Sequence, residues 1–156
     1  MISLKSLELK VPPLALVGIM ALAMWGVRAS APGFQVDIPT SRLAAAVFFL
    51  AGGTACLAGI ASFRLARTTV NPTRPGAATA LVRSGVYRLS RNPMYLGFLF
   101  VLIGLGFLLS HPLTFLFPGL FVLYMDRFQV KPEERHLSSI FGNEFAEYHR
   151  SVRRWL

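Results

Sequence analysis

The chain has 156 residues, of which 54% are hydrophobic and 15% are charged, and its formal net charge is +9. This composition is far more apolar than a soluble domain of this length requires, so we expect a membrane protein. A single cysteine excludes an internal disulfide and a multi-thiolate zinc site, and the three histidines have no ligand spacing, so no metal is expected. Because the basic residues flank hydrophobic runs, the charge favours anionic lipid over nucleic acid as a partner.

Two hydrophobic runs come first along the chain. The run over about 11–27 follows Lys5 and Lys10 and precedes small residues at 29–31, so a cleaved signal peptide is the alternative to a membrane span. We expect it to be retained as a span. The second run, over about 43–61, is also long enough to cross a bilayer, which takes about 20 residues.

Small residues in these runs indicate close helix packing. In the second run they recur at helical spacings of three and four, which lets another helix approach closely. This stripe consists of Gly52, Ala55, Cys56 and Gly59.

A third run over about 94–109 and a fourth over about 113–128 are separated by three residues, so the sequence predicts a tight helical hairpin. Close helix packing explains Gly104 and Gly106 in the third run as well as the approach of a ligand does. The fourth run is short and contains Pro118, so it must either kink or gain length from the polar residues that follow.

The basic residues predict the topology. Two of the sixteen Lys and Arg residues precede the first span, two lie in 28–42, six lie in 64–91, and six follow residue 125. Four crossings with both termini inside place fourteen of them on one face, and the positive-inside rule makes that face cytoplasmic.

The segment 79–97, TALVRSGVYRLSRNPMYLG, concentrates polar and aromatic residues before the third run. Asn92 suits an N-cap, Pro93 suits the first helical position, and Tyr95 suits the lipid interface. A helix start and a functional site explain these residues equally well.

The segment 129–156 predicts an amphipathic helix. Pro132, Glu133 and Glu134 are typical of a helix N-terminus, and apolar residues follow at helical spacing. By composition this helix lies on the membrane and anchors the chain through its basic residues.

These two segments together resemble the isoprenylcysteine carboxyl methyltransferase family, which is related to membrane phospholipid N-methyltransferases. The matching elements, in order, are LVRSGVYRLSRNPMYLG, EERHL, FGNEF with Tyr148, and a basic VRR ending. The resemblance covers roughly residues 70–156.

The resemblance implies S-adenosylmethionine as cofactor, with S-adenosylhomocysteine as product, and a lipid-like acceptor that enters from the bilayer. It places the cofactor between the two segments, with Glu133 or Glu134 closing the site. The implied cofactor-binding residues are Thr79, Ala80, Leu81, Val82, Tyr87, Arg91, Asn92, Pro93, Met94, Tyr95, Glu133 and Tyr148.

The acceptor chemistry stays open at this point. A carboxylate acceptor would need an arginine to orient it, and Arg127 and Arg154 are the candidates. An amine acceptor would need a proton acceptor, which favours Glu134 or Tyr148.

The chain departs from the family pattern at two positions. Asn92 replaces the usual histidine and cannot titrate. Gln129 stands where eukaryotic carboxyl methyltransferases have a substrate-binding arginine, which weighs against a prenylcysteine carboxylate unless Arg127 replaces it.

The sequence therefore predicts an all-α, multi-pass membrane protein with a single domain over 1–156 and a C-terminal amphipathic helix. We expect a methyltransferase with a cytoplasmic active site and a lipophilic acceptor. The alternatives are a phospholipid N-methyltransferase and a non-enzymatic scaffold that binds anionic lipid, and the oligomeric state is left open.

Overall fold

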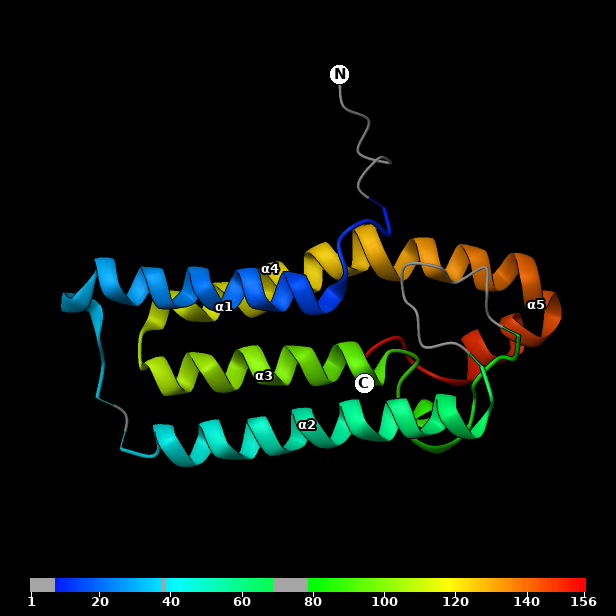
Figure 1. The fold of residues 1–156 in the computed structure, drawn as a ribbon, viewed down its shortest axis with the longest axis horizontal. Coiled ribbons are helices and arrows are strands. Elements are labelled where there is room, and N and C mark those ends of the chain that lie inside the picture. Colours follow the sequence, from blue (N-terminus) through cyan, green and yellow to red (C-terminus); the bar gives the residue numbers. More distant parts are fainter. Residues whose placement is uncertain (1–7, 38, 69–78) are drawn as a thin grey trace, which may run out of the picture.

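The structure, a computed structural model, describes residues 8–37, 39–68 and 79–156, and the regular elements of these residues are all helical (Figure 1). The all-α prediction is therefore confirmed. The α-helices are α1 Pro13–Ser30, α2 Ser41–Leu65, α3 Pro93–Leu109, α4 Leu116–Met125 and α5 Lys131–Ser151. Shorter turns are the 3₁₀ turns Pro32–Phe34, Gly85–Arg88 and Pro112–Phe115 and the π-helical turn Asp126–Val130.

Helices α1 to α4 form an elongated bundle with two different ends (Figure 1). At one end, which we call the loop end, the α1–α2 and α3–α4 connections meet. The backbone N–H of Val36 donates to the carbonyl of Ser110 at 3.0 Å, and His111 Nε2 lies 3.0 Å from the carbonyl of Ala31. The opposite end, which we call the site end, carries α5, the segment before α3 and the C-terminus.

The stripe of small residues in α2 packs against α3 within the same chain. A Cβ placed on Gly52 would lie 2.6 Å from the carbonyl oxygen of Gly97, and a Cβ on Gly59 would lie 2.4 Å from the side chain of Met94. Any side chain at these glycines would separate the helices. The predicted close packing is confirmed, and α3 is the partner of α2.

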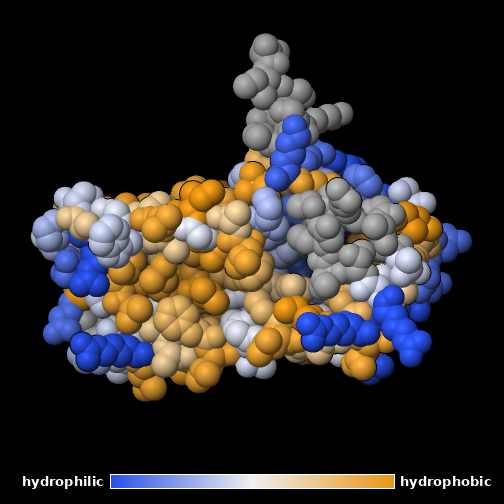
Figure 2. All heavy atoms as spheres, viewed as in Figure 1, coloured by the Kyte–Doolittle hydropathy of each residue, from blue (hydrophilic) through white to orange (hydrophobic). Residues whose placement is uncertain are grey.

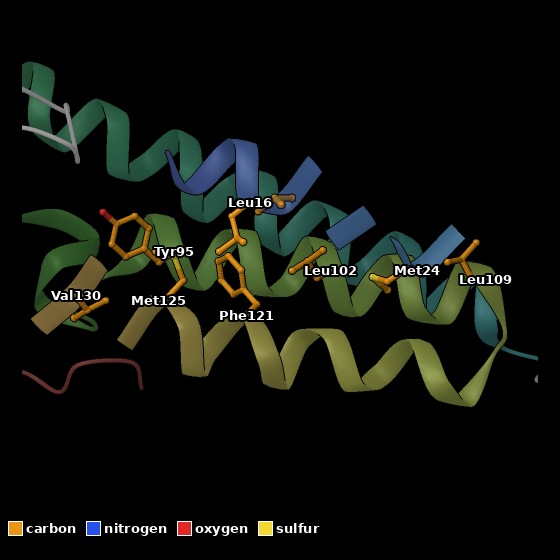
Figure 3. Packing of buried hydrophobic residues seen from close by; sticks show 9 residues of the cluster. Leu16, Met24, Tyr95, Leu102, Leu109, Phe121, Met125 and Val130 are labelled. Carbon is orange, nitrogen blue, oxygen red and sulfur yellow. The ribbon is translucent and has the colours of Figure 1, made fainter. Parts of the chain in front are cut away.

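The bundle is apolar on the inside and on the outside. Its interior is filled by buried residues such as Met24, Leu102 and Phe121 from three helices (Figure 3). Its outer surface is also apolar, since Leu22 and Leu50 are each 72% exposed and orange residues cover the middle of the bundle (Figure 2). Exposed apolar surface of this extent is typical of contact with lipid.

Helices α1 and α2 are long and apolar enough to cross a membrane, and α3 is a shorter apolar helix of 17 residues. Helix α4 has ten residues, but the helical path begins in the turn Pro112–Phe115 and continues through the π-helical turn into α5. Pro118 lies in the first turn of α4, where proline is tolerated. The sequence predicted that the fourth run would either kink or gain length from the residues that follow, and the structure shows that it gains length.

Helix α5 is interrupted at Gly142, whose φ of +48° is left-handed and suits glycine. Its two arms, 131–141 and 143–151, diverge there, and the second arm turns back toward the bundle (Figure 1). The amphipathic pattern is confirmed. However, Phe145 and Tyr148 are buried against Val82 and Tyr87, so this part of the apolar face packs on protein.

Candidate functional site

A cavity of about 480 Å³ lies at the site end of the bundle. It brings together the starts of α1 and α3, the end of α2, the segment 80–92 and both arms of α5. Most residues that the resemblance implied are among those lining it. These are Ala80, Leu81, Val82, Tyr87, Arg91, Asn92, Met94, Tyr95, Glu133, Glu134 and Tyr148.

The helix start at Asn92 and Pro93 positions one wall. Pro93 is the first residue of α3 and Asn92 occupies the N-cap position, as predicted, but the Asn92 side chain makes no capping bond. Its amide Nδ2 instead donates to the carbonyl of Arg154 at 3.0 Å. Asn92 therefore joins the cavity wall to the C-terminal residues.

Glu133 and Tyr95 meet across the cavity from α5 and α3. The Tyr95 hydroxyl donates to Glu133 Oε2 at 3.0 Å and accepts from Gln129 Nε2 at 3.5 Å. Burial, reinforced by Glu134 and opposed by the Tyr95 hydrogen bond, raises the pKa of Glu133 to about 8. Its carboxyl group is therefore largely protonated at neutral pH, and a cation beside it would favour the ionised form.

Glu134, the next residue, is held in a charge network. Arg91 pairs with Glu134 Oε1 at 2.9 Å, and Arg154 pairs with Oε2 at 2.6 Å. Arg154 also reaches Asp126 at 2.6 Å, and its carboxylate partners, Glu134 first, raise the pKa of Arg154. Both oxygens of Glu134 are thus bound by guanidinium groups, which leaves Glu133 as the cavity carboxyl without a cationic partner in the described part of the chain.

The third wall is aromatic. The Tyr148 hydroxyl donates to the carbonyl of Tyr87 at 2.8 Å, and the Tyr87 ring packs edge-on against Phe63 with 5.4 Å between centroids. Burial raises the pKa of both tyrosines above the usual range, so both stay protonated. This wall offers aromatic faces and apolar surface, which suit a heteroaromatic ring.

Four implied residues do not line the cavity. Pro93 is buried but is not among the lining residues. Thr79 bonds to the Thr68 hydroxyl, with its backbone N–H at 3.0 Å and its own hydroxyl at 3.2 Å. Arg127 pairs with Glu8 at 3.1 Å. Arg154 lies behind Glu134, as described above. The structure therefore does not bring Arg127 or Arg154 to the cavity surface as acceptor-orienting groups.

Several lining residues were not among the implied cofactor-binding residues, although Leu137 and Phe145 lie within the matched elements EERHL and FGNEF. They come from the start of α1, from α2 and from the apolar side of the other helices, and they are Pro12, Pro13, Leu14, Cys56, Ile60, Phe63, Phe98, Val130, Leu137 and Phe145. The small-residue stripe was the available clue to Cys56, because it predicted which face of α2 meets another helix. Nothing in the sequence pointed to the start of α1.

The lining combines apolar and aromatic residues with Glu133 and several residues of the segment 80–92. This donor set suits an organic cation with a ring system and hydroxyl groups. In the described ranges, no group of three or more His, Cys, Asp or Glu side chains is placed to hold a metal ion.

Comparison with known proteins gives a consistent picture. Residues 40–144, more than half of the chain, match the phospholipid methyltransferase family. The chain is 40% identical over 83 residues, 51% of its length, to a protein-S-isoprenylcysteine O-methyltransferase of Saccharomyces cerevisiae. It is 36% identical over 72 residues, 46% of its length, to the protein of the same name in Homo sapiens.

These matches cover 34% of the yeast protein and 25% of the human one, so the chain matches about a third of the first relative's length and a quarter of the second's. An uncharacterized protein of Haemophilus influenzae is matched over its full length, with 40% identity over 63 residues, which are 40% of this chain. The family match and these relatives agree with the motif order seen in the sequence, and we conclude that the chain belongs to the phospholipid methyltransferase family.

Proposed function

We propose that this chain is a membrane-embedded methyltransferase that uses S-adenosylmethionine and methylates a lipophilic acceptor. The observation that carries the proposal is the cavity in which Glu133 and Tyr95 meet, because a buried carboxyl without a cationic partner is suited to a cationic ligand. The cavity volume of about 480 Å³ is within the range of small-molecule sites.

The residues present fit such a cofactor. Tyr87, Tyr148 and Phe145 would hold the adenine ring, the backbone of 80–82 would contact polar edges, and Glu133 would pair with a positive charge. S-adenosylmethionine supplies an activated methyl group on a sulfonium. The protein then has to align the acceptor and keep water away, which the largely apolar lining does.

The acceptor would reach the cavity from the lipid side. Leu14 and Ile60, from α1 and α2, line the cavity, and Leu14 is 68% exposed on the bundle surface. An acyl or prenyl chain could lie along these residues while its polar end points toward Glu133.

A phospholipid N-methyltransferase, with an amine acceptor, is the second candidate, and one observation favours it. Arg91 is the cationic residue that lines the cavity in the described ranges, and its guanidinium is bound to Glu134 and to backbone carbonyls. Arg127 faces Glu8, and position 129 is a glutamine. A carboxylate acceptor would find no free cation among the described lining residues, whereas an amine acceptor does not need one.

Binding of S-adenosylhomocysteine to the detergent-purified chain tests the proposal. We expect binding that weakens at least tenfold in Glu133→Gln and is unchanged in Glu144→Gln, an exposed carboxylate paired with Arg83. If the unaltered chain does not bind, the enzyme interpretation is wrong and a lipid-binding scaffold takes its place. Labelled S-adenosylmethionine then separates the acceptors, because a methyl ester is lost in base and an N-methyl group is not.

We further propose that the chain crosses the membrane four times with the site end in the cytoplasm. Of the described Lys and Arg residues, Arg28 and Arg42 flank the loop end and the others lie at the site end, as the positive-inside rule requires. In a Cys56→Ser background, an impermeant thiol reagent added outside cells should label Gly33→Cys and leave Ser138→Cys unlabelled. The reverse pattern would invert the orientation.

A further inference from the structure

The C-terminal residues 152–156 lie directly against the segment that enters α3 (Figure 1). The backbone N–H of Arg91 donates to the carbonyl of Arg153 at 2.9 Å. The carbonyl of Arg154 accepts from the Ser90 hydroxyl at 3.2 Å and from Asn92 Nδ2 at 3.0 Å. Ser90, Arg91 and Asn92, at the end of the segment 80–92, therefore bond to the backbone of two consecutive residues of 152–156, which we call the tail.

Side chains reinforce this junction. Arg91 Nη1 donates to the carbonyl of His149 at 2.8 Å and to that of Val152, while its Nη2 pairs with Glu134. Arg154 joins the tail to Glu134 and to Asp126. Beyond it, Trp155 packs against the hydrophobic core of the bundle. The tail is thus attached at both its polar and its apolar residues.

The tail itself does not line the cavity, whereas Arg91 and Asn92 do. The segment 80–92 contains one 3₁₀ turn, Gly85–Arg88, and otherwise has no regular structure to hold it. Its position must therefore come from tertiary contacts, and the bonds to residues 152–156 supply several of them at the entry to α3.

We infer that residues 152–156 act as a latch, in that their bonds to residues 90–92 fix the position of the segment 80–92. Asn92 is then a positioning residue that works through this latch. The inference rests on the proposed function for its ligand. It assigns Asn92 the task of donating a hydrogen bond to the Arg154 carbonyl. The same task is open to a neutral histidine, the residue that the family pattern has at this position, because its ring N–H is also a donor.

Substitutions at position 92 separate the hydrogen-bond donor of Asn92 from the size of its side chain. Asn92→Asp keeps the size of the side chain but replaces the donor with an acceptor that faces a carbonyl oxygen. Asn92→His restores a donor. Asn143→Asp, at an exposed position in α5, makes the same chemical change away from the junction and serves as the matched control.

The experiment combines two measurements on the full-length purified chain. Hydrogen exchange of the Arg91 amide reports the junction without any ligand, and the affinity for S-adenosylhomocysteine reports the cavity. We expect Asn92→Asp to accelerate exchange and to weaken binding by about tenfold each, Asn92→His to recover most of both effects, and Asn143→Asp to stay within about threefold of the unaltered chain.

Unchanged exchange and affinity in Asn92→Asp would overturn the inference, and so would an Asn92→His variant as impaired as the aspartate. If Asn92→Asp does not fold, Ser90→Ala, which removes one neutral bond to the same carbonyl, must show the same two effects at smaller size. A chain that binds no S-adenosylhomocysteine but shows the exchange pattern would refute the proposed function while retaining the latch.

Discussion

If the proposed function is right, the raised pKa of Glu133 makes cofactor binding depend on pH in a way that can be calculated. If the ionised carboxylate pairs with a positive charge on the ligand, binding below the pKa must first remove a proton. With the pKa at about 8, the affinity should be about tenfold below its plateau at pH 7 and about a hundredfold below it at pH 6. Above about pH 9 the slope should vanish, because the carboxyl group is then almost fully ionised.

The assay is equilibrium binding of S-adenosylhomocysteine to the detergent-purified chain at constant ionic strength between pH 6 and pH 9. Glu133→Gln serves as the comparison, because any titration of the ligand itself appears equally in both proteins and cancels. We expect the ratio of the two affinities to change about a hundredfold over this range. A ratio that stays constant would refute the assignment of Glu133 as the counter-ion.

The same shift has a consequence for stability without ligand. A carboxyl group whose pKa is higher in the folded chain than in the unfolded chain keeps more protons when folded. The free energy of unfolding should therefore fall as pH rises from about 4.5 to about 8, and this decline should be smaller in Glu133→Gln. Thermal denaturation in detergent at pH 5 and pH 8 measures it, and equal declines would contradict the buried position of this carboxyl.

Three further predictions test the packing and the limits of the site. Gly97→Ala should destabilise the chain by about 1–3 kcal/mol, because the new Cβ would lie 2.6 Å from a sulfur atom of α2, whereas Gly53→Ala meets nothing within 4 Å and should be neutral in the same thermal assay. Phe121→Ala, at a fully buried position, should cost about 3 kcal/mol and Leu123→Ala, at a position 68% exposed, far less; similar losses would mean that the core is misplaced. Arg127→Ala should leave S-adenosylhomocysteine affinity and methyl transfer within about twofold, and a larger loss of transfer alone would return this arginine to acceptor orientation.

Much of the fold was readable from hydrophobic runs. The predicted spans 11–27, 43–61 and 94–109 correspond to α1, α2 and α3 within a few residues at each end. The fourth run was harder to read, because its helical path combines a 3₁₀ turn, ten α-helical residues and a π-helical turn. Such changes in helix type depend on packing and leave no pattern in hydropathy.

The candidate site was predicted in part. Motif order identified the two segments, and these segments do meet in the structure at Tyr95 and Glu133. The sequence left Glu133 and Glu134 as alternatives, since two adjacent acids look the same in a motif. The ion pairs of Glu134 with Arg91 and Arg154 distinguish them, and those partners are 43 and 20 residues away along the chain.

Composition, run length and the placement of basic residues were thus enough to predict an all-α membrane protein with its polar segments at one end, because these properties reflect the solvent around each stretch of chain. The contribution of the start of α1 to the cavity, and the ion pairs that distinguish Glu134 from Glu133, were decided by tertiary structure alone. The bend at Gly142 turns the second arm of α5 back toward the bundle, and the tail then reaches Asn92 through backbone carbonyls. Backbone carbonyls are the same in every residue, so no sequence pattern could reveal this last contact.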